Sequence, residues 1–150
     1  MTTLFTIGYE HATSDAVLGE LERAKIDLVV DVRAVAASRR PGFSKRQFAA
    51  GLDERGIAYL HLRALGTPKE GRLAARAGKL DELFTLYQEH LRTPDAREAM
   101  DELTALVQSG KRICILCYER DVHACHRQWI AEEIDKRLGV GAKHLAAPQG

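Results

Sequence analysis

Residues 113–138 read ICILCYERDVHACHRQWIAEEIDKRL, and this stretch decides the fold. Its first five residues form an unbroken apolar run, which is typical of a strand buried on both faces of a sheet. From about Cys125 onward, Ile130, Ile134 and Leu138 recur every four positions, which is typical of a helix that packs by one face. A buried strand followed by such a helix is the repeating unit of α/β proteins with a parallel sheet.

The same alternation of apolar runs and amphipathic stretches extends through the rest of the chain. Further strands are predicted at residues 4–7, 27–32 and 57–60, with an edge strand at 143–145. Helices are predicted from Ser14 to about Lys25, from Ser44 to Gly56, and on both sides of Pro94. We therefore predict a single α/β domain over residues 1–150, with a mainly parallel sheet of about five strands and helices on both faces.

Local signals indicate where two of these helices begin. Ser14 is expected to cap the first helix. Ser44 and Gln47 have the spacing of a capping box, while Phe43 and Phe48 occupy the two positions of a hydrophobic staple. The second helix is therefore predicted to start at Ser44.

The stretch between the third strand and Pro94 is predicted to contain one loop and one helix. Residues 65–78 carry turn residues and basic side chains, so they are predicted to form a loop. The helix that follows is expected to bury the stripe of Leu80, Phe84, Tyr87 and Leu91.

Composition narrows the class of protein. In the chain of 150 residues, 29% are charged and 45% hydrophobic, which is ordinary for a globular protein and argues against a disordered or fibrous one. The formal net charge is +1, so affinity for nucleic acid or another anion must come from a local cluster. No apolar run approaches the roughly 20 residues of a membrane helix, and the first residues lack a secretion signal. Three cysteines fit a reducing compartment better than a disulfide framework, so we expect a cytoplasmic protein without membrane contact.

Polar residues follow each predicted strand directly. Tyr9 follows the first strand, Asp31 and Arg33 lie at the end of the second, and Cys117 and Glu119 lie at the end of the fourth. Ligands of open α/β sheets bind outside the carboxyl ends of the strands. We therefore expect these side chains to gather in one site.

His126 and Arg127 extend the buried stripe of the last helix toward its N-terminus. Polar side chains on an inward stripe need partners, because an unpaired buried charge is costly. A pocket over the sheet would supply them, as would an ion pair to Asp31 or Glu119. We favour the pocket.

Cys117 has two interpretations. A thiol at the end of a buried strand, facing a helix N-terminus and a nearby arginine, is placed as a nucleophile would be. A free cysteine is also often a small core residue, and Glu119 would oppose a thiolate. Cys114 lies three residues away in the same strand, so it points to the opposite face and is not expected to share a metal or a disulfide with Cys117.

Metal binding stays an alternative. Cys117, Cys125 and His126, with Glu119 or His123, are suitable donor types. Their spacing matches no reliable zinc pattern, so no metal ligand is predicted, and the sequence leaves the cofactor unknown.

A basic loop precedes the second helix. Arg39, Arg40, Lys45 and Arg46 flank residues 41–44, so arginines and backbone amides at this helix N-terminus could hold a phosphate. Arg39 is our candidate for this contact.

Several motifs together resemble the domain-of-unknown-function family 488 in order and in spacing. They are Thr6-Ile7-Gly8-Tyr9, Val30-Asp31-Val32-Arg33, Ser38-Arg39 with Pro41-Gly42-Phe43-Ser44, Tyr59-Leu60-His61-Leu62 with Leu65-Gly66, and Leu116-Cys117-Tyr118-Glu119 with Cys125-His126-Arg127. The resemblance covers Thr3 to His144. It implies a compact α/β domain in which the aspartate-arginine pair and the cysteine, glutamate and Cys-His-Arg segments form a shared site. One departure is Thr67-Pro68, where the family more often has a further glycine and basic residues.

A weaker analogy links the chain to rhodanese-like domains, which carry sulfur on a cysteine that ends a strand. Such domains also have a strand that ends in Asp-Val-Arg, as at residues 31–33. Here the loop from Tyr118 to Ala124 is longer than the expected cradle and contains Glu119. Sulfur transfer is therefore kept as an alternative only.

The leading hypothesis is a small enzyme that acts on an anionic, phosphate-containing substrate, with nucleic acid included. The catalytic candidates are Cys117, Glu119, His126 and Asp31. The candidates for substrate binding are Tyr9, Arg33, Arg39 and Arg127. The rival hypothesis is a non-catalytic nucleotide or nucleic-acid binding module, and the sequence does not decide between enzyme and module.

Overall fold

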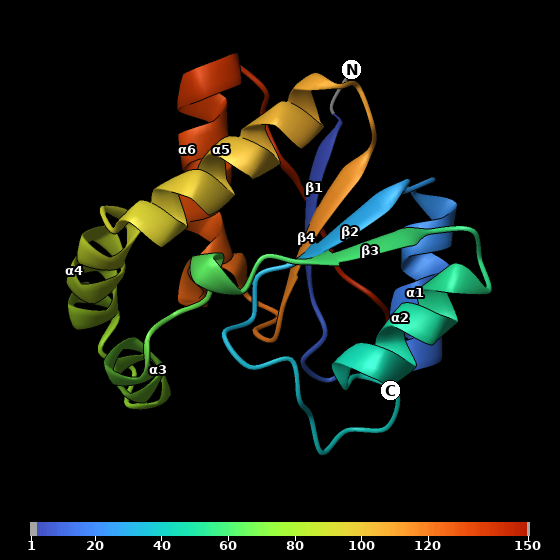
Figure 1. Ribbon diagram of the computed structural model, residues 1–150. Coiled ribbons are helices and arrows are strands. Elements are labelled where there is room, and N and C mark those ends of the chain that lie inside the picture. Colours follow the sequence, from blue (N-terminus) through green and yellow to red (C-terminus); the bar gives the residue numbers. More distant parts are fainter. Residues whose placement is uncertain (1–2, 150) are drawn as a thin grey trace.

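The computed structural model describes residues 3–149 and contains a five-stranded sheet in which all strands are parallel (Figure 1). The strand order is β3-β2-β4-β1-β5, which places β4 at the centre, as predicted. The strands are β1 (Leu4–Gly8), β2 (Leu28–Asp31), β3 (Ala58–His61), β4 (Ile113–Cys117) and β5 (Lys143–Leu145). The prediction of an α/β fold with a parallel sheet is confirmed.

Helices cover both faces of this sheet. In Figure 1, α1 (Ser14–Arg23) and α2 (Lys45–Asp53) lie on one side, and α5 (Pro94–Gln108) and α6 (Arg127–Leu138) lie on the other. The remaining elements are α3 (Lys69–Arg76), α4 (Leu80–Leu91) and the short 3₁₀ turns η1 (Arg63–Leu65) and η2 (Val122–Ala124). Among residues 3–149, no helix combines the length and the apolar character needed to cross a bilayer.

The central strand contributes to two separate cores. Ile113, Ile115 and Cys117 belong to the core beneath α5 and α6. Cys114 and Leu116 belong to the core beneath α1 and α2. This alternation follows from the two-residue period of a strand, and it confirms that Cys114 and Cys117 point to opposite faces.

The register of the strands aligns their carboxyl ends. Gly8 of β1 pairs with Cys117 of β4, and Asp31 of β2 lies between Leu116 of β4 and His61 of β3. The polar residues that follow these strands therefore leave the sheet at one edge, as expected from the sequence.

Helix starts are close to the prediction, but their side-chain contacts differ. Thr13, not Ser14, caps α1, because its hydroxyl accepts a hydrogen bond from the Ala16 amide across 3.1 Å. Ser44 is the N-cap residue of α2, as predicted, yet its hydroxyl bonds to the backbone of Ser38 instead of the helix. The predicted capping box is therefore wrong.

The hydrophobic staple of the same helix is confirmed. The rings of Phe43 and Phe48 stack with centroids 5.8 Å apart. The capping-box partner Gln47 instead accepts a hydrogen bond from the Gly42 amide across 3.3 Å, outside the helix.

The predicted loop at residues 65–78 is also wrong, because residues 69–76 form α3. Gly71 lies inside this helix, where it has a packing role. A Cβ atom at Gly71 would lie 2.5 Å from the Cγ2 atom of Thr67. In α4 the buried residues are Leu83 and Tyr87, whereas Leu80 and Phe84 of the predicted stripe are 41% and 46% exposed.

Candidate functional site

A pocket of about 790 Å³ opens at the carboxyl ends of β1, β2 and β4. Groups with acid, base or nucleophilic chemistry come from the segment after β1, from the end of β4 and the segment after it, and from the N-cap of α6, and α3 supplies two arginines. Among its lining residues are Tyr9, Glu10, Arg33, Thr67, Arg72, Arg76, Cys117, Tyr118, Glu119 and His126. Pockets of this size bind small molecules in many proteins.

Asp31 and Arg33 form a buried ion pair at the base of the site. The Nη2 atom of Arg33 lies 2.7 Å from Oδ2 of Asp31, and both side chains are at most 6% exposed. Tyr59 donates a hydrogen bond to the same carboxylate oxygen across 2.6 Å. Burial opposes the charge of Arg33, but the Asp31 carboxylate more than offsets it and raises the pKa of Arg33. Asp31 is thus held by two donors and does not line the pocket.

Arg33 connects this pair to the aromatic residues beside it. Its Nη1 atom donates to the Phe43 carbonyl across 2.7 Å and to the Tyr9 hydroxyl across 3.2 Å. Tyr9 in turn stacks on Phe43, with ring centroids 4.3 Å apart. Arg33 therefore fixes the position of Tyr9 at the edge of the pocket.

Arg127 is enclosed beneath the pocket, with 1% of its surface exposed. Its guanidinium donates to the Cys117 sulfur across 3.0 Å, and to the backbone carbonyls of Glu119 and Arg120. Its Nε atom donates to the Thr6 hydroxyl across 3.2 Å. The partners are thus a cysteine sulfur, a hydroxyl and carbonyls, not the carboxylate of Asp31 or Glu119 that the sequence offered as an alternative to a pocket.

The electrostatics of Arg127 follow from this enclosure. Burial lowers the pKa of Arg127 to about 10, which leaves the guanidinium charged at neutral pH. Gly8 makes the arrangement sterically feasible, because a Cβ atom there would lie 1.7 Å from the carbonyl oxygen of Glu119. A positive charge is therefore fixed beside the Cys117 sulfur.

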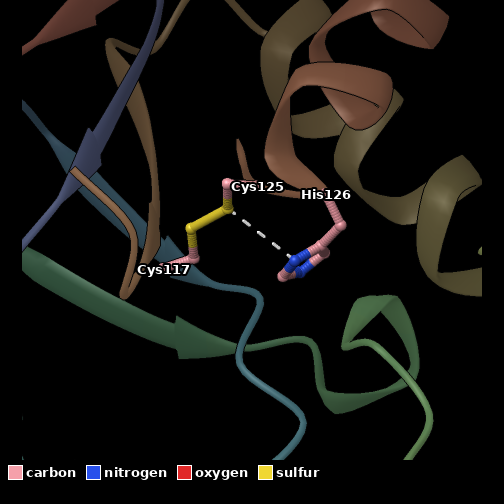
Figure 2. A group of neighbouring side chains, drawn as sticks. All are labelled: Cys117, Cys125 and His126. Atoms are coloured by element: carbon pink, nitrogen blue, oxygen red, sulfur yellow. Dashed lines mark hydrogen bonds between the residues drawn. A yellow bond between two sulfur atoms is a disulfide. The ribbon is translucent and has the colours of Figure 1, made fainter. Parts of the chain in front are cut away.

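The sulfur atoms of Cys117 and Cys125 lie side by side and are joined as a disulfide in Figure 2. Both residues are buried. The turn η2 brings Cys125 back to the end of β4, eight residues after Cys117. The sequence placed both cysteines near the site but did not pair them.

His126 adjoins this pair from the N-terminus of α6. Its Nδ1 atom lies 3.8 Å from the Cys125 sulfur, as the dashed line in Figure 2 marks. Its Nε2 atom lies 2.9 Å from the carbonyl oxygen of Val32. A carbonyl only accepts, so Nε2 carries the proton and Nδ1 presents a lone pair toward the sulfurs. Burial lowers the pKa of His126 to about 4, so the ring is neutral at neutral pH.

Glu119 lies on the pocket surface one residue beyond Tyr118. Burial raises the pKa of its carboxyl, and the charge of Arg127 offsets part of this shift. A carboxyl with a raised pKa exchanges a proton more readily near neutral pH, which suits a general acid or base.

Two arginines of α3 were not predicted as site residues from the sequence. Arg72 and Arg76 lie one turn apart and both line the pocket. Arg72 also donates to the Thr67 carbonyl across 2.9 Å. Their four-residue spacing was the available signal, but it has meaning only if the stretch is interpreted as a helix.

The family comparison fits this arrangement. A profile of the domain of unknown function DUF488 matches residues 13–134. The chain belongs to the DUF488 family. The matched range includes the ion pair, both arginines of α3 and the segment from Cys117 to Arg127. No curated protein and no solved structure shows significant similarity to the chain.

The basic loop of this DUF488 chain does not reach the pocket with Arg39. The side chain of Arg39 is exposed and is not among the described residues that line the pocket. Its neighbour Arg40 turns inward and donates to the backbone carbonyls of Tyr9 and Ala12. The loop therefore contacts the segment after β1 through Arg40.

The structure brings most of the predicted site residues together. Those that line the pocket are Tyr9, Arg33, Cys117, Glu119 and His126. Asp31 and Arg127 lie behind it and contact lining residues, and Arg39 lies outside it. In the DUF488 chain, Asp31 and Arg127 thus contact residues that line the pocket and are not among the described residues that line it themselves.

Proposed function

We propose that this DUF488 chain is a small enzyme that acts on an anionic, phosphate-containing substrate in the pocket described above. One observation carries the proposal. Cys117, Glu119 and His126 line the same pocket as Arg72 and Arg76. The reactive side chains and the arginine side chains therefore face the same pocket.

The arginines of α3 favour a substrate that carries negative charge. Arg33 is paired with Asp31, so its charge is largely neutralised. Within residues 3–149, the hydrogen-bond partner of the Arg72 side chain is the Thr67 carbonyl, and Arg76 is exposed on the next turn of the helix. Arginine binds phosphate with two parallel hydrogen bonds, which makes these two side chains suitable phosphate ligands.

The size of the pocket and the charge of the chain favour a small substrate over a nucleic-acid duplex. A volume of about 790 Å³ lies within the usual range of roughly 300–1,000 Å³ for small-molecule sites. Binding along a nucleic-acid backbone relies on many cations, whereas the net charge here is +1. A mononucleotide or another small phosphate compound fits these properties.

Cys117 is the main candidate for the reactive residue in the pocket. The fixed charge of Arg127, 3.0 Å from the sulfur, favours a thiolate over a thiol. Glu119 is available to move a proton, and the neutral ring of His126 offers a lone pair. A thiolate in this position serves either as a nucleophile or as a metal ligand.

Binding of adenosine monophosphate (AMP), measured by isothermal titration calorimetry at low salt, tests whether the pocket binds a phosphate compound. The double variant Arg72→Gln/Arg76→Gln is expected to bind AMP at least tenfold more weakly than the unchanged chain. Arg63→Gln/Lys69→Gln is a control of equal charge, because both side chains are exposed and neither lines the pocket. Equal weakening in both double variants would show that only overall charge matters and would contradict the proposal.

A turnover assay separates an enzyme from a binding module. The reduced protein is incubated with a panel of phosphate esters and nucleotides, and products are identified by mass spectrometry. Cys117→Ser is expected to bind AMP and to form no product. Product formation that is unchanged in Cys117→Ser would remove Cys117 from the reaction. AMP binding without any product in the unchanged chain would favour the binding module.

A further inference from the structure

We infer that, once a thiol reductant has supplied the two electrons and two protons that convert the Cys117–Cys125 disulfide to two thiols, Cys117, Cys125 and His126 bind one divalent thiophilic metal ion such as Zn²⁺ through two sulfurs and the imidazole Nδ1. The catalytic use of this metal rests on the proposed function, whereas the metal site itself does not. The inference rests on distances, on the tautomer of the imidazole and on the groups that surround the sulfurs.

The three donor atoms are already close enough for one ion. The sulfurs of Cys117 and Cys125 and a ring nitrogen of His126 all lie within 4.8 Å of one another. Donors bound to one tetrahedral zinc at roughly 2.0–2.3 Å are separated by about 3.5 Å. Reduction of the disulfide lets the two sulfurs move apart to non-bonded contact, which approaches this spacing.

The imidazole is oriented as a metal ligand. Because Nε2 of His126 donates to the Val32 carbonyl across 2.9 Å, the lone pair is on Nδ1, which faces Cys125 in Figure 2. Metal-binding histidines commonly donate their second ring N–H to a carbonyl or carboxylate, which fixes the tautomer and the ring plane. The Val32 carbonyl already makes this contact before a metal binds.

The surroundings of the sulfurs suit thiolates. Arg127 approaches Cys117 with Nη1 at 3.0 Å and Cys125 with its backbone nitrogen at 3.5 Å. Each thiol gives up one proton when it binds, so one metal ion releases two protons. Two thiolates cancel the charge of a divalent ion, and Arg127 then leaves the centre positive.

The protein supplies three ligands, which leaves a fourth position. Cys117 and His126 line the pocket, so this position faces the space that would hold the substrate. Three protein ligands with one open position are typical of catalytic zinc, and two cysteines with one histidine are a donor set that zinc enzymes use. Glu119 lines the same pocket and is not among the three donors, so it is free to exchange protons.

Anaerobic titration of the reduced, tag-free chain with Co²⁺ tests the site. A charge-transfer band from thiolate to cobalt is expected to saturate at one ion per chain and to disappear when Zn²⁺ is added. Cys117→Ser, Cys125→Ser and His126→Gln are each expected to weaken cobalt binding at least tenfold. Cys114→Ala is the matched control, because Cys114 is buried on the opposite face, and it is expected to keep the band. No band in the reduced chain, or an unchanged band in Cys125→Ser, would overturn the inference.

A measurement on the unchanged chain covers the case in which a cysteine variant fails to fold. Saturating Zn²⁺ is expected to protect Cys117 and Cys125 from alkylation, as measured by mass spectrometry of peptides. Alkylation of both residues at the same rate with and without Zn²⁺ would overturn the inference.

AMP binding distinguishes the failure of this inference from that of the proposed function. A saturable cobalt band without AMP binding supports the metal site and contradicts the proposed substrate. AMP binding at Arg72 and Arg76 without a cobalt band supports the proposed substrate and overturns the metal site.

Discussion

The Nη1 atom of Arg127 lies 3.0 Å from the sulfur of Cys117, and the arginine reaches it from beneath the pocket instead of from solvent. Hydrogen bonds to Thr6 and to two carbonyls of the segment after β4 hold the guanidinium in place. Arg127 thus couples the position of the backbone after β4 to the reactivity of Cys117, the last residue of β4.

Alkylation of the reduced, metal-free chain reports on this link. At neutral pH, iodoacetamide is expected to label Cys117 faster than Cys114, since Cys117 lines the pocket beside a cation and burial raises the pKa of Cys114. Arg127→Gln is expected to slow the labelling of Cys117 about tenfold, because a fixed positive charge stabilises the thiolate. Labelling of Cys117 that is as slow as that of Cys114 in the unchanged chain would contradict a reactive thiol.

Asp31 and Arg33 are expected to contribute to the free energy of unfolding as one ion pair, not as two independent residues. Asp31→Asn leaves the buried charge of Arg33 without its partner and is expected to cost about 3–5 kcal/mol in urea unfolding. Asp31→Leu/Arg33→Met removes both charges and is expected to cost less than Asp31→Asn. A double variant that is less stable than Asp31→Asn would show that the pair itself stabilises the fold.

His144 provides a pH-dependent contact on β5. The Thr6 hydroxyl, which accepts from Nε of Arg127, lies 2.7 Å from Nδ1 of His144 and can donate to this nitrogen only while the nitrogen is unprotonated. Burial lowers the pKa of His144, and the charges of Arg127 and His123 add to this shift.

The sign of the effect on stability follows from linkage. The unfolded chain binds a proton at His144 first as the pH falls through about 6.5, so the folded state loses stability from there down to the lower pKa of the folded chain. NMR titration of the imidazole is expected to give a midpoint below that of the urea-unfolded chain. A midpoint at or above the unfolded value would contradict the lowered pKa of His144.

Gly71 tests the packing of α3 against the loop before it. Replacing glycine by alanine inside a helix usually stabilises by up to about 1 kcal/mol. Gly71→Ala is expected to lower the melting temperature instead, because its Cβ atom would lie 2.5 Å from Thr67. Gly19→Ala in α1 is the matched control, since its nearest neighbour would lie at 3.6 Å, and it is expected to raise the melting temperature. A rise in both variants would contradict the close packing of α3.

The parallel sheet could be predicted from the sequence because its signals are local. Each buried strand is a short apolar run, and the polar residues that follow it mark its carboxyl end. Asp31, Cys117 and Glu119 were placed at one edge of the sheet on this basis, and the register of the strands confirms the alignment of those ends.

The remaining features depend on contacts between distant residues. Gly71 weakens any local prediction of a helix, and the sequence does not reveal that a Cβ atom there would lie too close to Thr67. The pairing of Cys125 with Cys117 requires the path of η2. Two of the partners of the Arg127 side chain are backbone carbonyls, which no side-chain pattern reveals.

A crystal structure of the reduced chain grown with ZnCl₂ and AMP, recorded at the zinc absorption edge, tests the proposed active site most directly. We expect an anomalous peak bonded to Cys117, Cys125 and His126, with the phosphate of AMP within hydrogen-bond distance of Arg72 and Arg76. AMP bound outside the pocket at the carboxyl ends of the strands would contradict the proposed active site. An anomalous peak away from the two cysteines would contradict the metal centre.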